Sequence, residues 1–169
     1  MKYFYYLLIF FFGLVSTNQL YAQAPNDTIA NGMAFKLGSK LTLKLVKNTQ
    51  NSFDYKVVKF SEFTEQFKIF ETEKLFEKNP EKETIEVIFG IGYYREGKED
   101  KDYQTVMLSR NNYSFPLQFD AEIKIWNKEE FEKTSVTPLN PGTRHTELWP
   151  YKIDFLALIN FRNYSYQSK

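Results

Sequence analysis

The residues that could do chemistry are few, and the single histidine of the chain, His145, is the most obvious of them. A serine, threonine or cysteine nucleophile needs a neighbouring base such as histidine, together with a third group that orients the base. Glu147 would share a side with His145 in an extended chain, and Arg144 is its neighbour. No serine stands in the G-x-S-x-G turn of the α/β-hydrolases. We therefore assign no catalytic residue and keep His145, Glu147 and Arg144 as an alternative polar site.

Clustered metal ligands are also missing from the chain. With no cysteine and one histidine, a zinc site of several such ligands cannot be built. The acidic residues come in runs interleaved with lysine, such as 81–86, which is typical of solvated faces and turns, and no run has the pattern of a calcium loop. Two acids facing each other across a cleft would suit glycoside hydrolysis, but no run points to such a pair. The sequence predicts no metal and no cofactor, and a hydrolase with a carboxylate or histidine site is one alternative function.

The stretch IEVIFGIGYYREGKED, residues 85–100, carries two glycines one residue apart, Gly90 and Gly92. A dinucleotide-binding loop needs a third glycine where this chain has Arg95, and a helix where this chain has a charged turn. The stretch fits a strand better, with Gly90 and Gly92 on one face beside Tyr94. Glycine in a strand often marks a close approach by another group. The two glycines therefore predict a shallow notch, filled either by a large side chain of the protein or by a ligand or partner flanked by Tyr94.

Trp126 is the second aromatic residue that could serve binding. It falls on the polar face of a predicted strand over 115–126, and an apolar side chain off the core face can mark an interaction site. The alternative is that Trp126 packs over the rim of the sheet. Together with Tyr94, Gly90 and Gly92, it makes up the predicted binding platform.

Apolar residues at every second position predict most of the elements that must position these side chains. The stretch 115–126 alternates without a break, and Pro116 suits the start of a strand. In 53–60 the alternation slips at Val58, which predicts a bulge or a switch of face. The segments 41–45 and 53–60 flank a polar turn and predict a hairpin. The predicted strands are 41–45, 53–60, 85–93, 103–110 and 115–126.

Two segments can be read as strand or helix. Residues 61–76 have phenylalanines at helical spacing as well as a short alternation, so their structure is left open. Residues 151–162 are apolar on both faces as a strand, which favours a central strand, although Pro150 would also suit a helix start. Residues 136–142 carry two prolines and a glycine and predict a corner. The predicted fold is all-β, a single antiparallel β-sandwich domain, with a small β-barrel or a β-rich α+β domain with one helix near 61–76 as alternatives.

The beginning of the chain has the layout of a secretory signal peptide. One lysine precedes an apolar run of about 13 residues, and small residues follow near Ala22. The run is shorter than the roughly 20 residues of a membrane-spanning helix. We predict a signal peptide over 1–22 cleaved after Ala22, a flexible leader over 23–32 and a single β-rich domain over 33–169. The protein would then be secreted or periplasmic, without integral membrane insertion after cleavage.

The overall charge and the missing catalytic groups limit the function. The chain has 22 basic and 21 acidic residues, a balance that gives no electrostatic attraction to nucleic acid. It lacks cysteine, so burial alone must stabilise it outside the cytoplasm. The sequence favours a non-enzymatic binding or interaction module with an unknown protein or glycan partner. A small carrier of an apolar ligand, built on a β-barrel, is the other alternative function.

Overall fold

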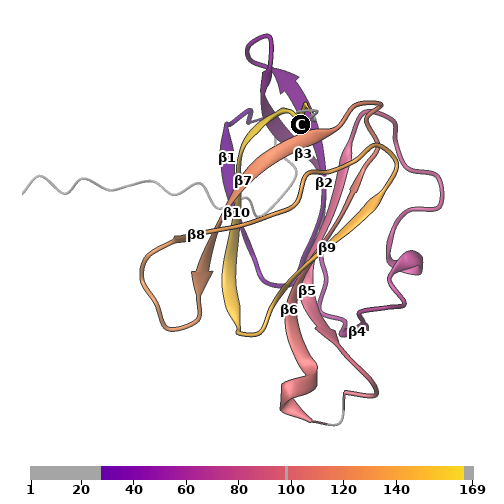
Figure 1. Ribbon diagram of the computed structural model, residues 1–169, viewed down its shortest axis with the longest axis vertical. Coiled ribbons are helices and arrows are strands. Elements are labelled where there is room, and N and C mark those ends of the chain that lie inside the picture. Colours follow the sequence, from indigo (N-terminus) through magenta and orange to yellow (C-terminus); the bar gives the residue numbers. More distant parts are fainter. Residues whose placement is uncertain (1–27, 98, 166–169) are drawn as a thin grey trace, which may run out of the picture.

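The computed structural model describes residues 28–97 and 99–165. In it, ten β-strands form one sheet, and all their pairings are antiparallel except the short parallel one of β4 with β5 (Figure 1). The described residues contain no α-helix and two short 3₁₀ turns, η1 (Glu73–Leu75) and η2 (Asp100–Asp102). The strands are β1 (Gly32–Lys36), β2 (Ser39–Lys47), β3 (Ser52–Glu62), β4 (Phe67–Lys68), β5 (Ile85–Tyr93), β6 (Tyr103–Asn111), β7 (Leu117–Ile125), β8 (Glu132–Thr134), β9 (Arg144–Trp149) and β10 (Ile153–Asn163). The prediction of an all-β antiparallel domain is confirmed.

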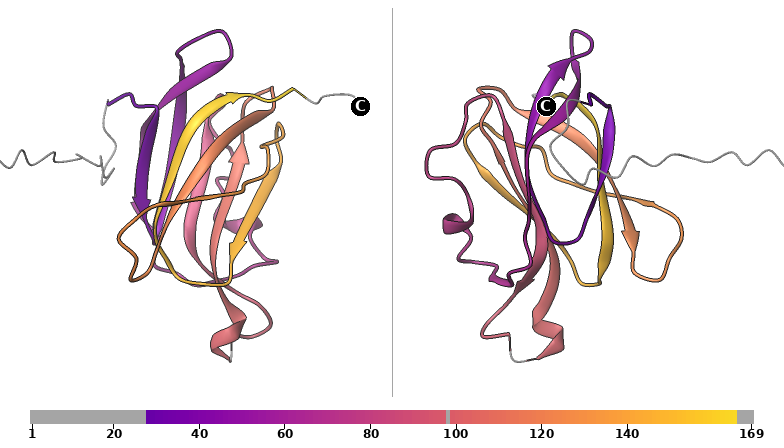
Figure 2. Two further views of the ribbon diagram at one scale, coloured as in Figure 1. Left: turned by 60° about the vertical axis from the view of Figure 1, so that its left-hand side comes forward. Right: turned by 180° about the vertical axis from the view of Figure 1, so that it is seen from behind.

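The sheet curls into a half-barrel, because its two halves are joined only at one end. The strand order is β8-β7-β10-β3-β2-β5-β6-β9, with β1 on β10 and β4 on β5. Strands β10 and β3 share only the pairs Phe161 with Phe53 and Arg162 with Ser52. Beyond that junction the half that holds β7 and β10 turns back over the half that holds β2, β5 and β6 (Figure 2). The two halves therefore enclose one core, as in a sandwich.

Alternate side chains of both halves fill this core. On β7 the buried positions 117, 119, 121 and 123 alternate with partly exposed polar ones, as the sequence pattern predicts. Large side chains from distant strands meet inside, so the space between the halves is packed rather than hollow. The largest fully buried side chains of this cluster are Tyr55, Phe35, Phe89, Phe119 and Phe161.

The irregularity predicted in the second strand is confirmed. Thr42 of β2 pairs with Lys59 of β3, while the next residue, Leu43, pairs with Val57. Val58 is therefore the extra residue of a β-bulge, which is why the alternation slips there. The hairpin between β2 and β3 also forms as predicted, and β5 and β6 form a second antiparallel hairpin.

The segment 151–162 is a strand, as favoured from the sequence, and forms most of β10. It pairs with β7, β1 and β3 and so lies inside the sheet. Its inner face is buried, but Phe155 and Ile159 on the outer face are only partly buried. The strand is therefore central in the sheet, as its two apolar faces suggested, but its outer face is only partly covered.

The alternative of a helix near 61–76 is wrong. Strand β3 continues to Glu62, and the only regular elements that follow within this segment, all of which is described, are the two-residue β4 and the turn η1. The apolar residues of this segment cover the outer face of β5 and β6, where they form a second, smaller cluster. We call it the outer cluster; its members are Phe67, Ile69, Phe76, Ile88, Val106 and Leu108. An irregular path can place each ring where the sheet has room, which a straight helix could not do.

The chain is tied to the sheet earlier than the predicted leader suggests. Ala30 exchanges two backbone hydrogen bonds with Tyr55, at 3.0 and 2.9 Å, and β1 begins at Gly32. The predicted signal peptide over 1–22 and residues 23–27 of the predicted leader lie outside the described residues. No helical segment in the described part of the chain has the length and apolar character that crossing a membrane requires.

The close packing of the outer cluster on the two glycines leads to a graded prediction. A Cβ on Gly92 would lie 2.7 Å from Ile69 and 2.8 Å from Val106, whereas one on Gly90 would lie 3.1 Å from the Phe63 ring. Because overpacking of a filled site costs roughly 1–3 kcal/mol, we expect Gly92→Ala to lower the free energy of unfolding in that range, and Gly90→Ala to lower it less. Denaturant unfolding measures both. Equal stability of the three proteins would contradict the packing described here.

Candidate functional site

The notch predicted at Gly90 and Gly92 exists, and the chain fills it itself. Phe63 and Phe67 lie over Gly90, and Ile69 and Phe67 lie over Gly92. Phe67 and Ile69 are almost fully buried, at 4% and 6% exposure. The glycines therefore offer no surface to a ligand, and the structure favours the simpler of the two sequence interpretations, a large side chain as filler.

Filling the notch has a consequence for the next residue, Phe70. The parallel pairs of β4 with β5 hold the segment, and Ile69 N–H donates to the carbonyl of Tyr93 at 3.1 Å. Glu71 N–H donates back to the Lys68 carbonyl at 3.0 Å, which closes a tight turn around Phe70. With Ile69 turned inward, Phe70 points outward and is 84% exposed.

Phe70 meets the predicted platform residue Tyr94 at this place. The two rings lie 5.6 Å apart between centroids and are tilted by 51°. A hollow of about 480 Å³ adjoins them, lined also by Arg95, Lys101 and Asp102. Tyr94 N–H donates to the Asp102 carbonyl at 2.9 Å, so the hollow is built on the base of the β5–β6 hairpin. We call Phe70, Tyr94 and this hollow the aromatic patch.

Trp126 lies at another place, after the end of β7. It is 53% exposed, and its backbone N–H donates to the Lys152 carbonyl at 3.0 Å. The Lys152 ammonium lies 4.9 Å from the centre of the indole ring, within the range of a cation–π contact. The indole thus covers the turn before β10 while staying half open to solvent. Its binding role stays a prediction, and no contact described for it joins it to Tyr94.

The alternative polar site around His145 holds a crossing segment in place. This segment, residues 134–143, leads from β8 to β9 across the open side of the half-barrel, and we call it the strap (Figure 1). The strap buries Leu139 at 1% exposure, and Leu139 exchanges two backbone hydrogen bonds with Leu117. The predicted corner over 136–142 is part of this segment and contains no strand.

Alternate side chains of β9 bind the strap at successive positions. Trp149 Nε1 donates to Thr134 Oγ1 at 3.0 Å. Glu147 Oε1 accepts from both the backbone N–H and the hydroxyl of Thr137, at 2.7 and 2.6 Å. His145 and Glu147 therefore do share a side, as the sequence suggested, and that side faces the protein's own chain.

His145 completes the series at the end of the strap. Its Nε2 accepts from the Asn140 N–H at 3.0 Å and lies 2.7 Å from Thr143 Oγ1. An accepting Nε2 requires the neutral ring. Burial lowers the pKa of His145, and the negative charge of Glu147 opposes this shift only in part. Arg144 points to a different contact, with its guanidinium 3.7 Å from the Glu73 carboxylate.

A serine does lie opposite His145, but without access to a substrate. Ser109 on β6 pairs with His145 on β9, and its hydroxyl is buried with no hydrogen-bond partner in the described structure. Ser109 is 0% exposed. A nucleophile needs a site where the reacting carbonyl can lie about 3 Å away, and here packed side chains occupy that space. Among the described residues, no group of three or more acidic or histidine side chains is arranged to hold a metal ion.

A buried ion pair also serves structure. Glu86 is 3% exposed and accepts from Arg110 Nε at 2.7 Å and from the Glu77 N–H at 3.1 Å. Arg110 in turn donates to the Glu77 carbonyl at 2.7 Å and lies over the Phe76 ring. The pair thus fastens the end of the segment that carries the outer cluster.

Phe70 is the residue that reasoning from the sequence missed. It was one of several phenylalanines at helical spacing in 61–76, where it would have shared a buried face. The signal that could have separated it is the turn: two apolar residues must fill the two-glycine notch, and the next one along an extended chain then points away from the sheet.

Comparison of the chain with protein-family models, with curated proteins and with solved structures finds no match.

Because His145 is the only histidine, the pH dependence of stability near neutrality reports on the strap. A lowered pKa means that the unfolded chain takes up the proton first as the pH falls. The stabilisation is fully present above the ordinary histidine pKa of about 6.5 and is lost as the pH falls through the lower pKa of the folded state. We expect the midpoint of unfolding to decrease as the pH is lowered from 7.5 to 5.5. In His145→Gln this midpoint should depend less on pH. NMR titration of the imidazole checks the pKa directly, and a value above 6.5 would contradict the geometry.

Proposed function

We propose that the protein is a non-enzymatic binding module that acts outside the cytoplasm and recognises a partner protein through the aromatic patch. The observation that carries this proposal is the 84% exposure of Phe70 on a turn whose neighbours are fixed. Solvent-exposed apolar side chains occur singly on many proteins. Phe70 differs because a second aromatic ring supports it and an open hollow adjoins it.

The aromatic patch has the features of an interface centre. Tyrosine and arginine are enriched among the residues that carry most of the binding energy of interfaces, and phenylalanine is enriched at interfaces as well. Covering a phenylalanine side chain contributes about 1.5–3 kcal/mol. Phe70 stands in the hydrogen-bonded turn that follows β4, and Tyr94 lies at the base of the β5–β6 hairpin, so little ordering is needed when a partner binds. Charged Arg95 and Lys101 line the same hollow and give it a polar rim.

The proposed location rests on the sequence. The basic start, the short apolar run and the small residues near Ala22 support a cleaved signal peptide. The absence of cysteine fits a domain that relies on its large aromatic core instead of disulfides. Secretion or a periplasmic location follows from these features as part of the proposal.

The alternative functions have less support from the geometry. A carrier of an apolar ligand needs a lumen, but the inward positions are taken by large packed side chains such as Phe89 and Phe119. A hydrolase built on His145 needs a free base, but His145 Nε2 already accepts a hydrogen bond from the strap.

Three single variants test the proposal and locate the site. Phe70→Ser and Tyr94→Ser should remove the same partner from a pull-down against the cell-envelope fraction of the source organism, since each removes half of the aromatic patch. Trp126→Ser is the matched control, because Trp126 is also an exposed aromatic residue but lies elsewhere. With the purified partner, Phe70→Ser should raise Kd at least about tenfold, which corresponds to 1.4 kcal/mol.

Two results would contradict this proposal. Capture of the same partners at the same Kd by the Phe70 and Tyr94 variants would exclude the aromatic patch. Loss of the partner with Trp126→Ser alone would move the site to the turn before β10.

A further inference from the structure

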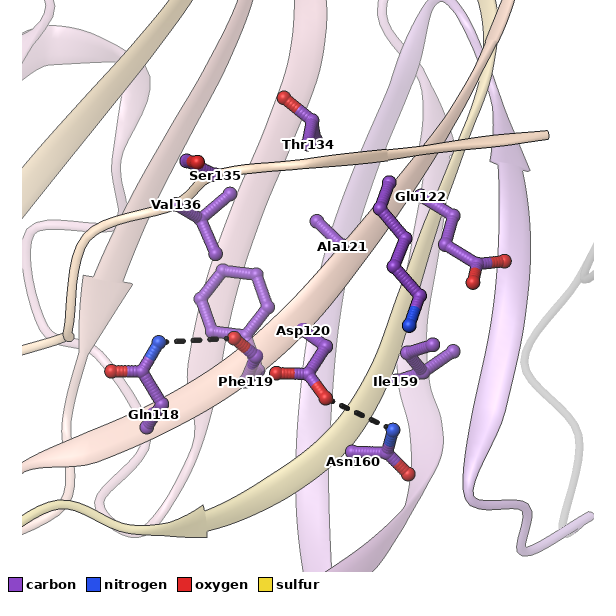
Figure 3. Close-up of a pocket in the computed structure, with 11 residues that line it drawn as sticks. Gln118, Phe119, Asp120, Ala121, Glu122, Thr134, Ser135, Val136, Ile159 and Asn160 are labelled. Atoms are coloured by element: carbon purple, nitrogen blue, oxygen red, sulfur yellow. Dashed lines mark hydrogen bonds between the residues drawn. The ribbon is translucent and has the colours of Figure 1, made fainter.

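A second hollow lies on the opposite half of the sheet and is polar in character. It has a volume of about 500 Å³ and lies over β7, between the start of the strap and β10 (Figure 3). Its floor carries the outward side chains of β7, Gln118, Asp120 and Glu122. Ligand sites typically enclose roughly 300–1,000 Å³, so the size suits a small molecule. We call it the β7 groove.

The β7 groove exists because the pairing of β7 is interrupted near the same residues on both of its sides. On one side β8 pairs with β7 only over 121–123, and the strap returns to β7 at the bridge between Leu139 and Leu117. On the other side the register of β10 shifts between Ile159 and Arg162. Asn160 stands in this bulge with a φ of +57°, in the left-handed region. Bulges and such backbone conformations concentrate next to functional sites.

Polar side chains of the groove are fixed before any ligand arrives. The Asp120 carboxylate accepts from Asn160 Nδ2 at 3.0 Å (Figure 3). It also accepts from Arg162 Nη2 at 2.8 Å. The Asn160 backbone N–H donates to Asn31 Oδ1 at 3.0 Å, which holds the bulge. Gln118 Nε2 donates to the Phe119 carbonyl at 3.2 Å. Such preorganisation lowers the entropic cost of binding.

The charges in the groove are balanced, and this determines the class of ligand. Partial burial works against the charge of Asp120, but hydrogen bonds from Arg162 and Asn160 and the nearby charge of Lys133 hold its pKa below the ordinary value. Asp120 therefore stays ionised at neutral pH. An anion would face Asp120 and Glu122, and a cation would face Lys133, while Arg162 already pairs with Asp120.

A neutral ligand with hydroxyl groups satisfies both kinds of side chain. A hydroxyl donates to a carboxylate and accepts from an ammonium or amide group. Val136 and Ile159 add apolar surface to the same groove, which suits the C–H groups of a sugar ring. We propose that the β7 groove binds a neutral sugar, with Asp120 and Glu122 as acceptors and Lys133 and Asn160 as donors.

Chemical-shift titration of the purified ¹⁵N-labelled protein tests the proposal. The probes are glucose, galactose, mannose and N-acetylglucosamine, each up to about 50 mM because single sugar rings commonly bind with millimolar Kd values or weaker. At least one should shift the backbone amide signals of 118–122, 133–136 and 159–160 and leave those of 68–71 and 94–95 unchanged. Asp120→Asn and Lys133→Gln should each raise Kd at least fivefold.

Matched controls distinguish a sugar site from an ion site and from a general loss of stability. Glu130→Gln removes an acid from the neighbouring turn, outside the groove, and should keep the Kd of the unchanged protein. Thermal unfolding of each variant confirms that it folds. No shift with any of the four sugars would overturn the proposal, as would saturable binding of inorganic phosphate or Ca²⁺ in the groove. The variants of the aromatic patch lie in the other half of the sheet. Failure of partner binding and failure of sugar binding can therefore be distinguished.

Discussion

The half-barrel depends on buried polar side chains that replace the ladder hydrogen bonds lost where the sheet curls. Tyr55 is the central example: at 0% exposure its hydroxyl accepts from the Met33 N–H at 2.8 Å and donates to the Leu158 carbonyl at 2.7 Å. On the opposite side Asn111 donates to the Phe115 carbonyl at 2.9 Å and adds a second hydrogen bond to the Leu139 carbonyl, also at 2.9 Å. An unpaired backbone group in such places would cost about 1–3 kcal/mol. These side-chain hydrogen bonds let the sheet curl and let the strap cross it without leaving these buried backbone groups unpaired.

The residues that look reactive in the sequence also serve as hydrogen-bond partners for backbone groups. His145 and Glu147 resemble parts of a catalytic site when only their spacing is known. In the folded chain, each accepts backbone N–H groups of a segment that has no strand partner along most of its length. Whether such a side chain faces a substrate or its own chain depends on where the strap crosses the sheet. Nothing local in the sequence determines that crossing.

The regular strands were predictable because their signal is local. Period-two alternation predicted β7 and β5, and the slip at Val58 predicted the bulge that the register shift confirms. The spacing of phenylalanines in 61–76 suggested a helix as one alternative for the same reason. Spacing is a local property and does not show which surface of the sheet these side chains must cover. The two glycines of β5 decide that surface: they leave room that only an irregular segment can fill. Phe70 is exposed because the residues before it point inward to fill that room.

The curl also determines how the two proposed sites relate to each other. The aromatic patch adjoins the outer cluster on the outside of the half that contains β5 and β6, while the β7 groove lies on the outside of the half that contains β7 and β10. Because these halves face each other across the core, their outer faces point in opposite directions. Neither site contributes a residue to the other. A partner protein bound at the proposed aromatic patch would therefore leave the proposed β7 groove open to a sugar, and the domain would then bridge two ligands without competition between them.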